Sequence, residues 1–190
     1  MKIVRRPLLA VVSLALPFLV AGGPLAGAAD GTQSESTSKH SSSPLLEKVR
    51  TATARYRDIN VAKAEGFVQA TPCVSGPNAG AMGVHFVLPA RVGGNAPVAD
   101  QPQALIYEPT GNGGTELVGV EFIVIAAPWD AAHPGSPPAL DGQLLNLVTS
   151  PNRYGLPSFY EIHVWAWERN PLGSFADWNT AVTCDKQPID

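Results

Sequence analysis

The chain has 190 residues, of which 45% are hydrophobic and 15% are charged, and its formal net charge is −3 at pH 7. Lys and Arg are scattered after the first six residues, and the absence of a basic cluster argues against nucleic acid or an anionic membrane surface as a partner. The chain is long enough for one domain with a substantial core.

The first 28 residues have the pattern of a secretory signal peptide. A basic patch within the first six residues precedes an apolar run over 7–20, and Ala26-Gly27-Ala28 supplies the small residues that a signal peptidase recognises. The apolar run is too short and too interrupted by proline to span a membrane well. We therefore expect cleavage after Ala28 and export to the periplasm or the extracellular space.

Residues 29–43 are rich in Ser and Thr and lack large apolar side chains, which predicts a disordered leader. A single globular domain is expected over 44–190. Ser43 and Pro44 are suited to the N-cap and first position of a helix. Apolar residues recur at helical spacing as far as Ile59, and Gly66 is a natural stop. The pattern predicts a helical region over 44–65, with or without a break near residue 58.

From Phe67 the pattern changes to short runs of Val, Ile, Phe and Tyr separated by Gly and Pro. These runs predict strands at 67–74, 83–88, 104–108, 117–125 and 159–168. The connection 126–152 contains five prolines, and we expect a long surface excursion of the kind that often forms lids or binding loops. The predicted fold class is α+β, with N-terminal helices packed on an antiparallel β sheet or partly closed barrel.

Cys73 and Cys184 are the only two cysteines. In an oxidising compartment the expected state is one disulfide between them, and the alternative is a pair of free thiols that act as a nucleophile or as metal ligands. A loop of this length corresponds to about 4–5 kcal/mol of stabilisation in the chain-entropy treatment of disulfides.

A hairpin over 104–125 is predicted from the Asn-Gly pair at 112–113, which favours a two-residue turn. The register that follows pairs Glu121 with Ala104 and Glu108 with Leu117. Glu108 and Glu121 then share a face but lie roughly 13 Å apart, at about 3.3 Å per residue. This separation leaves Glu108 outside a metal site built on Glu121, unless a bulge or a three-residue turn changes the register.

Three polar residues lie at the centres of hydrophobic strands: His85, Glu121 and His163. Each needs a partner, because burial of a lone charge is costly. Glu161 lies two residues before His163 and therefore on the same strand face. Imidazoles with one or two carboxylates suit Zn, Mn, Fe or Cu. His85, Glu121, Glu161 and His163 are thus the candidate ligands of one divalent transition metal.

Three interpretations of this set stay open. The residues bind a metal, they form a metal-free binding or acid–base cleft, or His85–Glu121 and His163–Glu161 are hydrogen-bonded structural pairs. In an unbroken strand Trp165 would share the face of His163, and so would Trp167. They are either core or rim packing, or candidate ligand-binding residues that stack on a carbohydrate or an apolar small molecule. A non-enzymatic secreted binding or surface-interaction module is the alternative function, and no reaction follows from the sequence.

The motifs at 82–85, 104–109, 117–122, 161–173 and 178–184 resemble an uncharacterised group of exported bacterial proteins. The resemblance spans most of 45–185, and 161–173 is its most specific part. It implies export and a single domain, but no catalytic residues. At the level of the fold alone, strand His and Glu residues around a metal are similar to cupin-type barrels. The chain departs from the cupin pattern because it lacks the cupin histidine pair and glycine spacing.

Overall fold

A computed structural model describes residues 43–187. These residues belong to one compact unit, His40–Asp190. The predicted signal peptide, 1–28, and the predicted leader as far as residue 42 lie outside the described residues. Within 43–187, no helix has the length and apolar character needed to cross a membrane.

The predicted helical region consists of α1 (Pro44–Thr53), a 3-10 helix (Ala54–Arg57) and α2 (Ile59–Ala64). Leu45, Val49 and Tyr56 of the predicted apolar stripe are buried. The break falls at Asp58, which has extended backbone angles and accepts a hydrogen bond from the backbone N–H of residue 60. Gly66 ends the region with φ 95°, a left-handed value that glycine adopts without steric cost.

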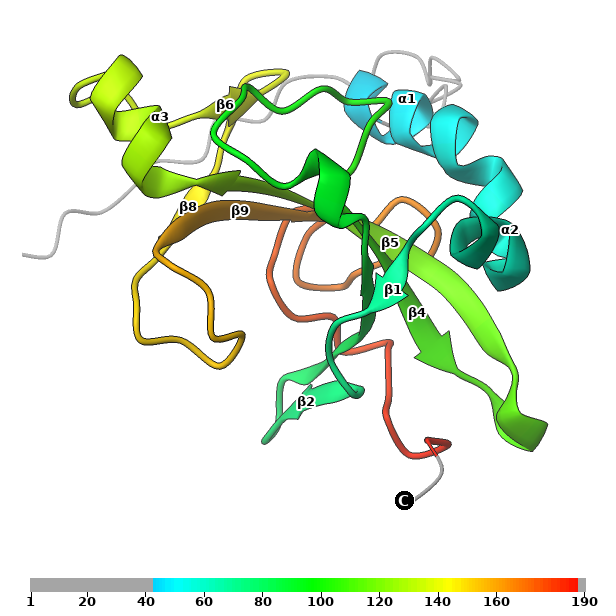
Figure 1. The fold of residues 1–190 in the computed structure, drawn as a ribbon. Coiled ribbons are helices and arrows are strands. Elements are labelled where there is room, and N and C mark those ends of the chain that lie inside the picture. The colour runs from blue at the N-terminus through cyan, green and yellow to red at the C-terminus, as the bar shows by residue number, and fades with distance from the viewer. Residues whose placement is uncertain (1–42, 188–190) are drawn as a thin grey trace, which may run out of the picture. The chain divides into compact units, whose positions relative to one another are not determined.

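The strands are β1 (Val68–Gln69), β2 (Val74–Gly76), β3 (Gly80–Val87), β4 (Ala104–Pro109), β5 (Thr115–Ile125), β6 (Ala139–Leu140), β7 (Gln143–Leu144), β8 (Asn146–Val148) and β9 (Phe159–Val164). Seven of them form one antiparallel sheet in the order β1-β3-β4-β5-β9-β8, with β2 also paired to β3. This sheet is strongly twisted and open, and α1 and α2 lie on one side of it (Figure 1). The α+β prediction is confirmed, in its open-sheet form.

The two faces of the sheet have different contents. One face packs on the helices and contributes Phe86, Leu105, Val120, Phe122 and Ile162 to the main core, together with Leu45 and Val49 of α1. Because side chains alternate along a strand, His85, Glu121, Glu161 and His163 belong to the opposite face. We call this opposite side of the sheet the site face.

The β4–β5 hairpin confirms the predicted register from Ala104–Glu121 to Ile106–Gly119 but not nearer the turn. The pairing shifts by one residue beyond Ile106, so that Glu108 lies opposite Glu116 rather than Leu117. A bulge in β5 and the longer turn over Gly111–Gly113 account for the shift. The Glu108 carboxylate accepts a hydrogen bond of 2.9 Å from Thr183 N, so it lies outside the candidate site, as expected.

The connection 126–152 is only partly a surface excursion. It holds α3 (Ala126–Ala132) and the small β6–β7 hairpin. Its last part, β8, was not predicted and pairs with β9 at the edge of the main sheet. β8 is short, and Leu147, one of its two apolar residues, is 51% exposed. Its sequence therefore lacks the alternation of buried apolar and exposed polar residues that identifies a strand.

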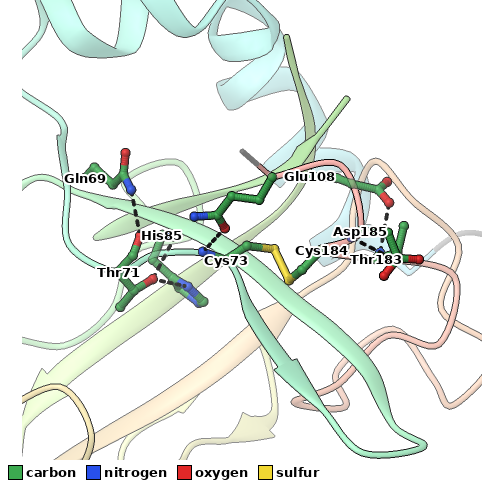
Figure 2. The surroundings of a disulfide bond; sticks show 9 residues. Gln69, Thr71, Cys73, His85, Glu108, Thr183, Cys184 and Asp185 are labelled. Carbon is green, nitrogen blue, oxygen red and sulfur yellow. Dashed lines mark hydrogen bonds between the residues drawn. A yellow bond between two sulfur atoms is a disulfide. The ribbon is translucent and has the colours of Figure 1, made fainter. Parts of the chain in front are cut away.

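The predicted disulfide Cys73–Cys184 is present. It joins the segment between β1 and β2 to the C-terminal coil, and Figure 2 shows it close to Thr71 and His85. Cys73 N also donates to Gln187 Oε1 at 2.6 Å. Further along the coil, Ala81 and Asn179 exchange two backbone hydrogen bonds of 3.1 Å. These contacts fix the C-terminal coil beside β3.

Candidate metal centre

His85 of β3, Glu121 of β5 and His163 of β9 converge on the site face. His85 Nε2 lies 3.3 Å from His163 Nε2 and 3.6 Å from Glu121 Oε2. One potential ligand atom from each residue lies within 4.8 Å of the other two, and all three residues are buried. The structure therefore brings together three residues that the sequence placed on separate strands.

The strand register explains this convergence. Glu121 pairs with His163 on one side and with Ala104 on the other. His85 lies two strands from Glu121, opposite Ile106 of the intervening strand. Neighbouring strands are about 4.8 Å apart, and the strong twist of the sheet (Figure 1) brings His85 of β3 toward His163 of β9.

His163 is held by aromatic stacking. Its ring stacks on Trp165, with ring centroids 5.9 Å apart and an interplanar angle of 13°. Gly119 of β5 leaves room for this tryptophan, because a Cβ at Gly119 would lie 3.2 Å from Trp165 Cε3 and 3.0 Å from the carbonyl oxygen of residue 164. His163 Nδ1 is buried and has no hydrogen-bond partner among the described residues.

Glu161 lies beside this cluster as a second buried carboxyl group. Its carboxyl group is close enough to that of Glu121 for the two to interact electrostatically, and its Oε2 atom has no hydrogen-bond partner within the described part of the chain. Glu161, His163 and Asp177 also form a group whose potential ligand atoms lie within 4.8 Å of one another. Asp177, which is half-buried, was not predicted, because it lies in the C-terminal coil, where no periodicity indicates which side chains face the sheet.

Thr71 is a second residue that the sequence did not identify. Its hydroxyl oxygen lies 3.3 Å from His85 Nδ1 and accepts a hydrogen bond of 3.3 Å from His85 N. Figure 2 shows Thr71 beside the His85 ring and near the disulfide. A hydrogen bond to the distal nitrogen is the usual way in which a metal-binding imidazole is oriented.

Burial controls the protonation of all four predicted ligands. It lowers the pKa of His85 to about 4, and together with the neighbouring His85 it lowers the pKa of His163 to about 3. Burial and mutual proximity raise the pKa of Glu121, and burial raises that of Glu161. In the metal-free protein the histidines are therefore neutral at pH 7, and the His85–Glu121 contact is not an ion pair.

The donor set and its spacing fit a divalent transition metal. Neutral imidazole nitrogen is the form that binds metal. Two nitrogens at about 2.0–2.1 Å from one tetrahedral ion are about 3.3–3.4 Å apart, and the two Nε2 atoms are 3.3 Å apart. A simple His85–His163 hydrogen bond has similar length, and His163 Nδ1 lacks a hydrogen-bond partner within the described residues in either case.

The two tryptophans proposed as a ligand-binding face do not lie together. Trp165 is 2% exposed, whereas Trp167 packs against the helix-side core and donates from Nε1 to Thr53 Oγ1 of α1 at 3.0 Å. The expected alternation fails because β9 ends at Val164, not at residue 168. Trp167 N then donates to the backbone oxygen of Val118 at the bulge in β5. The two tryptophans therefore do not form a shared, open surface for stacking.

A pocket of about 420 Å³ opens beside the cluster, and His85 and Glu121 form part of its wall. Tyr154 lies at the same wall, 6.4 Å from the His85 ring between centroids. Two of the three candidate ligands are thus reachable from a space large enough for a small molecule.

No family model, curated protein or solved structure matches this chain. The function is therefore inferred from the geometry of the site.

Proposed function

We propose that His85, Glu121 and His163 bind one divalent transition-metal ion, with Glu161 supporting Glu121. The observation that carries this proposal is the approach of three buried donor atoms from three strands, with His85 Nε2 at 3.3 Å from His163 Nε2 and 3.6 Å from Glu121 Oε2. Burial keeps both imidazoles neutral, which is the metal-binding form.

Two imidazoles and one carboxylate leave at least one coordination position open on Zn, Mn, Fe or Cu. When bound, such an ion supplies Lewis acidity at this position. Thr71 orients the His85 ring, Trp165 holds the His163 ring, and the Glu161 carboxyl group beside Glu121 is a second group that can exchange a proton. This arrangement supports small-molecule binding in the first instance, and acid–base chemistry where a reactive ligand is bound.

We further propose that the protein is exported. The basic and apolar pattern of residues 1–28 supports this proposal. The Cys73–Cys184 disulfide supports it independently, because structural disulfides are typical of oxidising compartments.

Elemental analysis tests the metal proposal. Protein produced from the full sequence, with its predicted signal peptide, and purified without chelator should contain close to one equivalent of a single transition metal. His85→Ala and His163→Ala should each lower the metal content by about ten-fold or more, because each removes one of three protein ligands.

His133→Ala is the matched control, because His133 is exposed and stacks on Trp129 of α3 with centroids 3.9 Å apart. Its metal content should equal that of the wild type. Circular dichroism should confirm that all three variants fold. Metal below one-tenth equivalent in folded wild type, even after dialysis against Zn²⁺, would contradict the proposal.

A further inference from the structure

We propose that the pocket beside His85 and Glu121 binds a small apolar monoanion, an aromatic or short aliphatic carboxylate, whose charged end completes the coordination of the metal. This inference rests on the proposed metal centre and adds the chemical class of its ligand. It depends on four features of the pocket: its apolar walls, its fixed loop, its balance of charge and the Tyr154 hydroxyl group.

The pocket walls are predominantly apolar. Its volume is about 420 Å³, within the roughly 300–1,000 Å³ of small-molecule sites and near the lower end of that range. The apolar wall residues include Val68, Val87, Val92, Ile123, Leu156 and Phe159. The polar residues at the pocket are Thr71, His85, Glu121 and Tyr154, so one end suits a polar group and the rest suits a hydrocarbon or an aromatic ring.

One wall is a loop that is held in place by Asn152. The side-chain oxygen of Asn152 accepts hydrogen bonds from Tyr154 N at 3.1 Å and Leu156 N at 3.3 Å. Its side-chain nitrogen donates to the backbone oxygen of Leu156 at 2.9 Å. The Tyr154 ring contacts Phe159 edge to face, with centroids 5.8 Å apart. Tyr154 and Leu156 are thus positioned before a ligand arrives, which lowers the entropic cost of binding.

Charge balance favours an anion. The residues that line the pocket include no Lys or Arg, and their only acidic residue is Glu121. A divalent ion bound by neutral histidines and one ionised carboxylate keeps one net positive charge in an otherwise apolar space. A monoanionic ligand neutralises that charge, whereas a neutral ligand leaves it buried at high cost. Outside the lining residues, Tyr154 also interacts with the acidic groups Glu161 and Asp177 and with the basic group Arg153.

Tyr154 provides a hydrogen-bond donor for the same anion. Its hydroxyl group donates to Met82 Sδ at 3.7 Å, and a thioether is a weak acceptor. Burial raises the pKa of Tyr154, so the hydroxyl group stays protonated and can turn to a carboxylate oxygen. Exchange of a sulfur acceptor for a charged oxygen strengthens the hydrogen bond.

Calorimetric titration with benzoate and benzamide tests this inference. The two probes have nearly the same shape and differ in charge. With protein that holds one equivalent of Zn²⁺, benzoate should bind at least ~10-fold more tightly than benzamide. After removal of Zn²⁺ by chelation, benzoate binding should weaken by a similar factor, because the residues that line the pocket then offer no positive charge.

Two substitutions of opposite charge at the pocket mouth distinguish binding of an anionic ligand from a general effect of the metal. Val68 lines the pocket and is 53% exposed, so it tolerates a polar side chain. At low ionic strength Val68→Lys should tighten benzoate binding and Val68→Glu should weaken it, each by about two- to five-fold, with no change for benzamide. Leu172→Glu is the control, because Leu172 is 59% exposed and does not line the pocket.

The outcomes distinguish the ligand from the metal centre. Stoichiometric Zn²⁺ with equal affinity for benzoate and benzamide, or with no response to the charge at residue 68, would overturn the inferred ligand and leave the metal centre standing. Leu156→Trp fills the pocket away from the metal ligands and should abolish benzoate binding at unchanged Zn²⁺ content. Failure of the wild type to bind Zn²⁺ would overturn both proposals.

Discussion

At the residue scale, the proposed metal centre depends most on His85 and His163, because burial fixes their protonation. The folded metal-free protein keeps both imidazoles neutral, since the pKa of His85 is lowered to about 4 and that of His163 to about 3. In the unfolded chain a histidine titrates near pH 6.5. Folding therefore selects the form of each side chain that binds metal, and the same burial makes the stability of the metal-free protein sensitive to acid.

The sign of this effect follows from proton uptake. Between pH 6.5 and the folded pKa values, the unfolded chain binds protons that the folded protein does not, so the free energy of unfolding falls as the pH falls. Each histidine contributes up to about 1.4 kcal/mol per pH unit. Glu121 acts in the opposite sense, because its raised pKa favours the folded state at low pH and this contribution is lost as pH rises above about 4.5.

We therefore predict that the His85→Gln/His163→Gln double variant has a flatter pH dependence of stability than the wild type between pH 6.5 and 4. Urea unfolding in the presence of a chelator measures the slope in each case. His133→Gln, which removes an exposed histidine outside the site, should retain the wild-type slope. Equal slopes for the double variant and the wild type would show that the two imidazoles are not buried in the neutral form.

The sequence could identify some of these residues and not others. His85, Glu121 and His163 are conspicuous because each interrupts an apolar strand, and Glu161 follows from two-residue alternation. Thr71, Tyr154 and Asp177 lie in coil, where no periodicity separates a buried polar residue from an exposed one. Trp167 was assigned to the wrong face because alternation was extended past Val164, where β9 ends.

At the element scale, β5 organises the site. It carries Glu121, pairs with β9 so that Glu121 lies beside His163, and contributes Gly119, which makes room for Trp165. The pairing near Glu121 matches the register predicted from a two-residue turn because the longer turn and the bulge in β5 offset each other. The bulge that shifts Glu108 could not be predicted, because it depends on the chain at Trp167 and Glu168 donating to the oxygen of Val118, a contact with residues far along the sequence.

Gly119→Ala tests the role of this close approach. The new methyl group would meet Trp165 Cε3 at 3.2 Å and the oxygen of residue 164 at 3.0 Å, so Trp165 and the stacked His163 ring must shift. We predict a loss of about 1–3 kcal/mol in the free energy of unfolding, together with weaker binding of Zn²⁺. Chemical denaturation and calorimetric Zn²⁺ titration measure the two effects.

Gly111→Ala is the control for this substitution, because nothing lies within 4 Å of a Cβ at Gly111. It should leave both stability and Zn²⁺ affinity within experimental error of the wild type. A Gly119→Ala variant with the same Zn²⁺ affinity as this control would show that Trp165 does not position His163 for metal binding.

At the scale of the described domain, an open sheet carries its hydrophobic core on the helix side and its polar cluster on the site face. The Cys73–Cys184 disulfide, with a sequence separation of 111, ties the C-terminal coil to the segment that carries Thr71. A metal ion would add a second long-range link, because His85 and His163 are 78 residues apart in the chain. The sequence could predict the helices, the central strands and the disulfide, but not the strand order that makes this contact.

X-ray absorption at the metal edge of the wild-type protein loaded with one equivalent of Zn²⁺ tests whether His85, Glu121 and His163 bind the ion. We predict two imidazole nitrogens at about 2.0–2.1 Å and oxygen donors in the remaining positions, without sulfur, and the same spectrum for His133→Ala. A first shell with fewer than two imidazoles, or a spectrum unchanged in both His85→Ala and His163→Ala, would contradict a metal centre formed by β3, β5 and β9.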